Sequence, residues 1–271
     1  MAAKAGNTTD PDEFGRAVRA ELRPASKYAM SLARMDYELR SAPAFPRYII
    51  IEPVGGVCGR KCPFCSINVI DRRDSSGKSV TGNMKWSHFM ELMEECSRHQ
   101  VYGLSLYMLG EPLYYRGTSK NLGPVDIVDM VRAAKSVGGF QVVNISTFAD
   151  VPNLSRLLSC NLDDLIISID GIDAEVYAEN RPSTKANDIG AFERTLERVH
   201  RFLKMKVQFT GRGPNVILQC INKANTASSI ADFIRYWINV YGVDSVFIKN
   251  LDSMRAWIPD VVSDEEDAIK A

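Results

Sequence analysis

Three cysteines, Cys58, Cys62 and Cys65, lie within eight residues at the spacing C-x3-C-x2-C. Thiols crowded into one short loop point to a metal site, because such crowding has no packing advantage. A structural zinc ion takes four ligands, and neither a fourth cysteine nor a suitable histidine lies nearby in the sequence. A [4Fe-4S] cube held by three thiolates leaves one iron open, and that iron can bind a substrate or a cofactor.

Further chemistry-bearing residues end the later strand-like segments. These residues are Gly110-Glu111-Pro112, Ser146-Thr147, and Ser168-Ile169-Asp170-Gly171 with Tyr177 and Arg181 downstream. A carboxylate such as Glu111 can accept hydrogen bonds from an ammonium group. A guanidinium such as that of Arg181 presents a fixed fork of donors suited to a carboxylate.

The cysteine motif resembles that of the radical S-adenosylmethionine (SAM) enzymes, in which the open iron chelates the amino and carboxylate groups of SAM. The later motifs resemble the same family in the expected order, over about residues 46–250. The Ser-Ile-Asp-Gly…Tyr…Arg pattern is most similar to relatives that carry SPASM or twitch auxiliary-cluster domains. Two positions depart from the family: Leu109 replaces a frequent glycine, and Phe148-Ala149 replace a common Asn-Gly.

The resemblance implies a role for each residue. Cys58, Cys62 and Cys65 would ligate the cluster, and Phe64 would lie near the adenine. Gly110 and Glu111 would receive the amino group of SAM, Ser146 or Thr147 would contact the ribose, and Ser168 and Arg181 would approach the carboxylate. Asp170 is included in the cofactor site, with a substrate contact or a helix cap as alternatives. Arg60 and Lys61, inside the cysteine loop, are expected to face solvent or an electron donor; the alternative is that they point at the cluster and raise its reduction potential.

The resemblance also implies a chemistry. A low-potential donor, such as a flavodoxin- or ferredoxin-like protein, reduces the cluster. SAM is then cleaved to a 5′-deoxyadenosyl radical that abstracts hydrogen from a small-molecule or peptide substrate. The cofactor carries the difficult step, and the protein supplies binding and orientation. The outcome, whether oxidation, epimerisation or cross-linking, is left open, and no catalytic residue is assigned beyond the cluster.

Three other functions fit part of the sequence. A non-catalytic iron–sulfur electron carrier or regulator would explain the cysteines but not Glu111, Ser168 and Arg181. A zinc-stabilised binding module would need a fourth ligand. A glycyl-radical enzyme activase would also use a single cluster, but the pattern around Asp170 favours the other branch of the family.

The elements that must position these residues alternate between strand and helix. Strands are expected at 47–52, 103–109, 141–147, 164–170, 215–221 and 244–250. Apolar stripes from Phe89 to Cys96, Ile127 to Ala134, Ile189 to Leu203 and Ile230 to Tyr241 predict helices between them, with a shorter turn at 153–160. Six such units predict an α/β fold with a parallel sheet in a partial (β/α)6 barrel, too few for a closed eight-stranded barrel.

Composition restricts the partners and the compartment. The 271 residues carry 33 basic and 33 acidic side chains, which argues against a nucleic-acid partner. The sequence contains neither an apolar run that could span a membrane nor a secretory signal, so a cytoplasmic location is expected. In that reducing compartment Cys96, Cys160 and Cys220 are expected to be buried free thiols.

Three regions are expected along the chain. Residues 1–45 form an N-terminal extension, mobile at first and then helical, and residues 46–250 form the core. Residues 251–271 form a tail with an acidic run. SPASM and twitch relatives have further cysteines after the sixth strand, and none follows Asn250 here. The sequence is therefore expected to be either a single-cluster enzyme or a chain that lacks its auxiliary domain.

Overall fold

The computed structural model describes residues 45–68, 72–73, 76–79 and 81–250. The expectations for the N-terminal extension before Phe45 and for the tail 251–271 lie outside the described residues. None of the helices in the described ranges is both long and apolar enough to cross a membrane.

Six parallel strands form the central sheet, and each falls on a predicted segment. They follow one another in chain order across the sheet, as β1 (Tyr48–Ile50), β4 (Gly103–Ser105), β7 (Val142–Thr147), β8 (Asp164–Ser168), β9 (Asn215–Asn222) and β10 (Ser245–Asn250). Within the described residues β1 and β10 do not pair, so the sheet is an open partial barrel. The predicted α/β fold class is confirmed.

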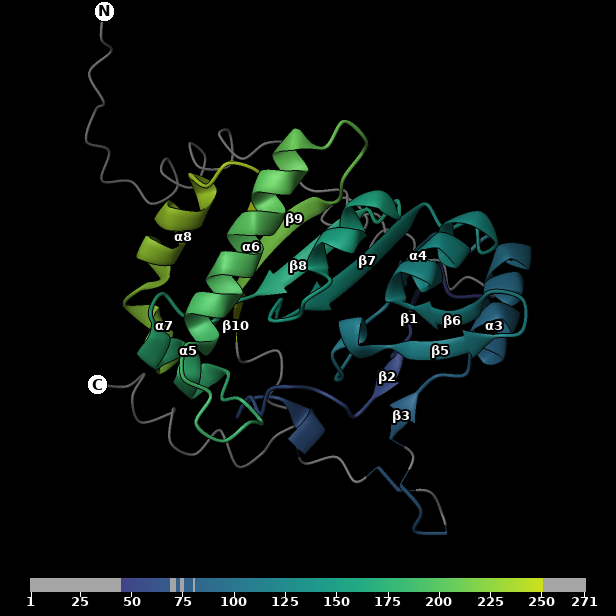
Figure 1. The fold of residues 1–271 in the computed structure, drawn as a ribbon, viewed down its shortest axis with the longest axis horizontal. Coiled ribbons are helices and arrows are strands. Elements are labelled where there is room, and N and C mark those ends of the chain that lie inside the picture. The colour runs from purple at the N-terminus through teal and green to yellow at the C-terminus, as the bar shows by residue number, and fades with distance from the viewer. Residues whose placement is uncertain (1–44, 69–71, 74–75, 80, 251–271) are drawn as a thin grey trace, which may run out of the picture.

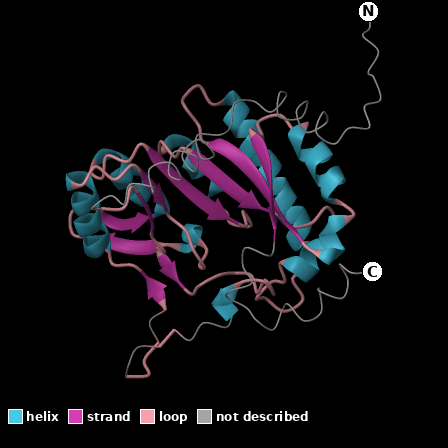
Figure 2. Ribbon diagram, turned by 180° about the vertical axis from the view of Figure 1, so that it is seen from behind, coloured by secondary structure: helices cyan, strands magenta, loops and turns pink. Residues whose placement is uncertain are grey.

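The helices connect successive strands and cover one face of the sheet (Figure 1). The α-helices are α3 (Trp86–Arg98), α4 (Ile127–Ser136), α5 (Ala174–Asn180), α6 (Ala191–Gln208), α7 (Ala224–Ala227) and α8 (Ile230–Ile238). Short 3-10 helices occur at η1 (Ser66–Asn68), η2 (Pro112–Tyr114) and η3 (Leu154–Ser159). Figure 2, drawn from behind, shows the strands of the opposite face with none of the described helices lying across them.

The predicted helices are confirmed, but Leu92 of the first apolar stripe is exposed and two other stripes extend beyond their helices. Ile189 is 90% exposed because α6 begins only after Gly190, whose left-handed φ of 78° turns the chain into the helix. Tyr241 is 82% exposed because α8 ends at Ile238. Both residues fit the apolar period but lie outside the helix that the period describes.

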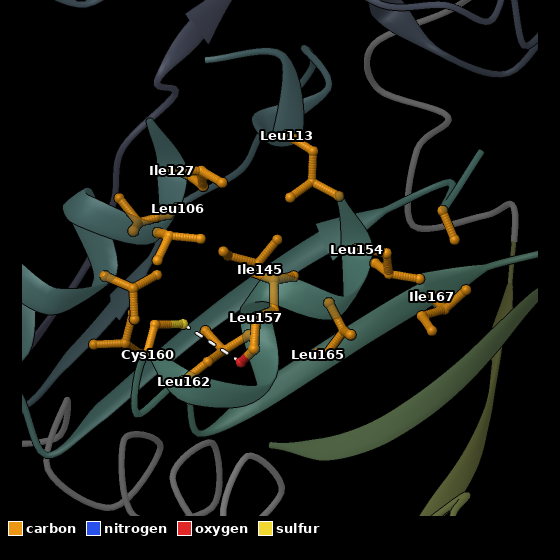
Figure 3. Packing of buried hydrophobic residues seen from close by; sticks show 14 of the residues in the cluster. Leu106, Leu113, Ile127, Ile145, Leu154, Leu157, Cys160, Leu162, Leu165 and Ile167 are labelled. Atoms are coloured by element: carbon orange, nitrogen blue, oxygen red, sulfur yellow. Dashed lines mark hydrogen bonds between the residues drawn. The ribbon is translucent and has the colours of Figure 1, made fainter. Parts of the chain in front are cut away.

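The main core lies between the sheet and the helices (Figure 3). Alternate residues of the central strands, such as Ile145, Leu165 and Ile167, point into it and meet Leu154 and Leu157 of η3. Cys96, Cys160 and Cys220 are buried free thiols, as predicted. This packing holds the sheet rigidly, so the residues at the ends of its strands have fixed positions.

Two antiparallel pairs were missed by the sequence analysis. The strand β2 (Val54–Gly55) pairs with β3 (Gly82–Asn83), and β5 (Arg116–Ser119) pairs with β6 (Gly123–Asp126). Strands of two to four residues are too short for an apolar alternation to reveal them.

Candidate cofactor site at the carboxyl ends of the strands

The three cysteines of the loop lie after β1 and β2, beside the carboxyl ends of the parallel strands. Cys62 is buried and packs against Phe64 and Ile221, with Cys65 at the edge of the same cluster. Burial raises the pKa of the Cys58 thiol to about 12, and burial is also the main cause of the raised pKa values of Cys62 and Cys65. As free thiols all three therefore hold their protons at neutral pH.

The cysteine loop supplies three thiols that could hold an iron–sulfur cluster. No three His, Cys, Asp or Glu side chains in the described ranges converge closely enough to hold one metal ion. A [4Fe-4S] cube binds each thiolate through a different iron, so its ligands need not converge on one point. Three half-buried or buried thiols in one loop are a donor set that fits such a cube.

The backbone of the cysteine loop is bonded to the segment that follows Arg181. The amide of Lys61 donates to the carbonyl of Pro182 at 2.8 Å, and the amide of Thr184 donates to the carbonyl of Gly59 at 3.1 Å. A Cβ atom on Gly59 would lie 2.5 Å from the hydroxyl of Tyr114, so a larger residue here would have to displace the Tyr114 side chain. The loop is thus fixed from two sides.

Glu111 lies in the loop that follows β4, directly before η2, and its carboxylate accepts three hydrogen bonds. Its Oε1 atom accepts hydrogen bonds from the Leu113 amide at 3.1 Å and from the Thr147 hydroxyl at 2.8 Å. Its Oε2 atom accepts from the Phe148 amide at 3.2 Å. Burial nevertheless dominates and raises the pKa of Glu111 to about 7. A cation bound beside this carboxylate would favour its charged form.

The backbone around Gly110 packs against the turn that leads into the cysteine loop. A Cβ atom at Gly110 would lie 1.9 Å from the carbonyl oxygen of Val54. The Glu111 amide donates to the Val57 carbonyl at 2.9 Å. The sequence analysis missed Glu52, whose carboxylate accepts from the Gly110 amide at 3.1 Å. These contacts hold the Gly-Glu-Pro motif directly against the residues that precede Cys58.

Arg181 lies between Asp170 and Cys62. Its Nε atom donates to Oδ2 of Asp170 at 2.7 Å, and its Nη1 atom donates to the Cys62 sulfur at 3.9 Å. Burial alone would lower the pKa of Arg181, but the charges of Asp170 and Cys62 outweigh burial and raise it. Asp170 also accepts from the Ile221 amide at 2.7 Å. Asp173, not Asp170, caps the following helix α5.

The remaining predicted residues lie on the neighbouring strand ends. Ser168 is buried, and its hydroxyl accepts a hydrogen bond from Gln219 Nε2 at 3.1 Å, a partner that sequence reasoning did not find. Ser146 is half-buried one residue before Thr147 on β7. The ring of Phe64 lies 5.8 Å below the ammonium of Lys223. All eleven predicted residues therefore come from the loops and strand ends at one edge of the sheet.

The expectation that Arg60 faces solvent is wrong. Its side chain is buried, because its guanidinium pairs with Asp150 at 2.8 Å and lies over the rings of Phe148 and Tyr177. Lys61, the next residue, is exposed as expected. The partner Asp150 lies 90 positions away in the sequence, so no local pattern could have indicated this contact.

Comparison with known proteins gives structural relatives only. No protein-family model matches the sequence, and neither does any curated protein. Among solved structures, anSMEcpe with bound AdoMet matches at TM-score 0.53 and 15% identity, over 75% of this chain and 52% of that chain. Methylornithine synthase (PylB) matches at TM-score 0.50 and 19% identity, over 75% of this chain and 53% of that chain.

The matched region spans about half the length of each of these structures. Both are radical SAM enzymes, and the expected resemblance to that superfamily is confirmed at the level of the fold. The open sheet of six parallel strands, with its cysteine loop after the first strand, has the fold of the radical SAM core.

Proposed function

We propose that this chain is a radical SAM enzyme. Cys58, Cys62 and Cys65 would ligate a [4Fe-4S] cluster, and SAM would bind at its open iron. One observation carries the proposal: the cysteine loop meets both Glu111 and Arg181 at one edge of the sheet. The charges of these two side chains both act on the pKa of Cys58, so an anionic and a cationic group lie beside the candidate cluster site.

Two sets of side chains would bind the amino-acid part of SAM, one at its ammonium group and the other at its carboxylate. Glu111, held by Thr147 and by the Phe148 amide, would accept hydrogen bonds from the ammonium. Arg181 and Ser168 would approach the carboxylate, and Asp170 would hold Arg181 in place.

The nucleoside part would extend along the neighbouring strand ends. Phe64 would lie beside the adenine, Ser146 or Thr147 would contact the ribose, and Gly110 would present its backbone to the ammonium. When bound, the cluster and SAM would supply the 5′-deoxyadenosyl radical that abstracts hydrogen from the substrate.

The substrate is proposed to be a small molecule or a peptide. The likeness to anSMEcpe, one of whose structures carries AdoMet and the Cp18Cys peptide, gives support for a peptide. The likeness to methylornithine synthase gives support for a small molecule. A low-potential electron donor of the flavodoxin or ferredoxin type and a cytoplasmic location complete the proposal.

The test is anaerobic reconstitution followed by iron and sulfide analysis and a 5′-deoxyadenosine assay with SAM and a strong reductant. We expect about four irons per chain and formation of 5′-deoxyadenosine. The variant Cys62→Ala should lose both, and the matched control Cys96→Ala, which alters a buried thiol of the core, should keep both. A cluster that never cleaves SAM would contradict the proposal and favour an electron carrier.

A further inference from the structure

Arg60 is a buried cation inside the cysteine loop, and burying its charge costs free energy. The residue is 3% exposed. Its Nε and Nη1 atoms have no hydrogen-bond partner in the described part of the chain, and Nη1 lies 3.8 Å from the Asp188 carboxylate. A buried ion pair with unsatisfied donors adds little to stability, because an apolar side chain of similar volume would serve as well. The cation therefore calls for a role other than stability.

Asp150 connects Arg60 to the helix α6. The Asp150 carboxylate accepts from Arg60 at 2.8 Å, from Arg194 at 3.1 Å and from Arg198 at 2.5 Å. Arg194 also pairs with Asp188 at 2.6 Å. Since Asp150 follows β7 and both other arginines belong to α6, Arg60 ties the cysteine loop to two separate elements of the core.

Two aromatic rings fix the direction of the Arg60 side chain. The guanidinium carbon lies 5.1 Å from the Phe148 ring and 5.4 Å from the Tyr177 ring, within the range of a cation–π contact. Phe148 stands where the radical SAM enzymes that the sequence resembles commonly have Asn. The same residue gives its amide to Glu111, so the ring under Arg60 and the amide on Glu111 come from one residue.

We propose that Arg60 is a positioning residue that fixes the cysteine loop before iron binds. Its salt bridge with Asp150 and its contacts with Phe148 and Tyr177 hold Cys58 and Cys62, which flank it, at the spacing that a cluster requires. This inference rests on the proposed function for its purpose. The position of the loop itself is a property of the chain without iron.

The first experiment uses the chain without iron and measures amide hydrogen exchange in the peptide that covers residues 58–65. In Arg60→Lys, which keeps the charge but not the planar fork, exchange should become several-fold faster. The control Arg198→Lys alters another partner of Asp150 that lies outside the loop, and it should leave this peptide unchanged. Unchanged exchange in Arg60→Lys would overturn the proposal.

The second experiment measures how fast the reconstituted chain loses its iron–sulfur absorbance to a chelator. Loss should be about 10-fold faster in Arg60→Lys and in Asp150→Asn, since residues that support metal ligands commonly have effects of this size. The double variant should be no worse than either single variant, because both act through one contact. Additive effects, or losses that only follow the melting temperature, would overturn the proposal. A wild-type chain that takes up no iron would contradict the proposed function, while the exchange experiment would still decide the role of Arg60.

Discussion

The Nη1 atom of Arg181 donates to the sulfur of Cys62 at 3.9 Å, although 119 positions separate the two residues in the sequence. The same guanidinium pairs with Asp170, which is itself in a left-handed backbone conformation with φ of 51°. A buried non-glycine residue in that region stores strain, which is common where a side chain must be held at a site. The strained Asp170 backbone and the Cys62 thiol are thus joined through the side chain of Arg181.

Removal of Arg181 should expose the cost of a buried, unpaired carboxylate. We expect Arg181→Gln to lower the free energy of unfolding by about 3–5 kcal/mol at pH 7, because the buried Asp170 side chain would lose its cationic partner. Adding Asp170→Asn should recover much of that loss, since the amide oxygen can still accept from Ile221. Urea denaturation of the single and double variants measures both effects, and a single variant within 1 kcal/mol of wild type would be contrary to this account.

Glu111 should make the chain without cofactor less stable as the pH rises. Its pKa is about 7 in the folded state and 4.5 in the reference state, so the folded chain holds a proton that the unfolded chain releases between these values. Stability contributed by this group should fall through that window by about 3 kcal/mol. Asp164, with its pKa raised by burial to about 6, contributes in an overlapping window.

The matched comparison for Glu111 is Glu111→Gln, measured by denaturation from pH 4.5 to 8. The variant should show a much flatter fall in stability, while Asp164 still contributes its share. It should also bind SAM more weakly, because the neutral amide cannot attract the ammonium. A variant with the slope of wild type would show that Glu111 is not the group that titrates.

Ala149 should tolerate glycine unusually well. It has φ of 60°, in the left-handed region that penalises a Cβ atom by roughly 1–2 kcal/mol. Relief of that strain should offset the lost methyl contacts, so Ala149→Gly should stay within about 0.5 kcal/mol of wild type. The buried helical Ala134 is the matched control, and Ala134→Gly should cost at least about 1 kcal/mol. Equal losses in thermal denaturation would argue against strain at Ala149.

Gly110 should accept no side chain. Its added Cβ atom would meet a backbone oxygen at 1.9 Å, so Gly110→Ala should displace the Gly-Glu-Pro motif and lower stability by about 3 kcal/mol or more. At Gly213 an added Cβ atom would meet its nearest neighbour at 3.6 Å, an ordinary contact, so Gly213→Ala should be nearly neutral. Melting temperatures of the two variants give the comparison, and similar values would refute the steric argument.

The sequence by itself determined the architecture and the candidate site residues. Apolar periodicity located all six strands, because strands buried in a parallel sheet give continuous apolar runs. The cysteine spacing, Glu111 and Arg181 could be found because each lies within a short local motif that follows a strand. Carboxyl ends of parallel strands meet at one edge, so chain order alone predicted that these residues would gather.

Only the tertiary structure decided which partners these residues have. The contacts of Arg60 with Asp150, of Gln219 with Ser168, and of Glu52 with Gly110 each join separate strands or loops. A buried charge must find a partner, but the sequence does not say which distant group is brought within 3 Å of it. The start of α6 after Gly190 and the end of α8 at Ile238 also depend on local backbone geometry, which the spacing of apolar residues does not reveal.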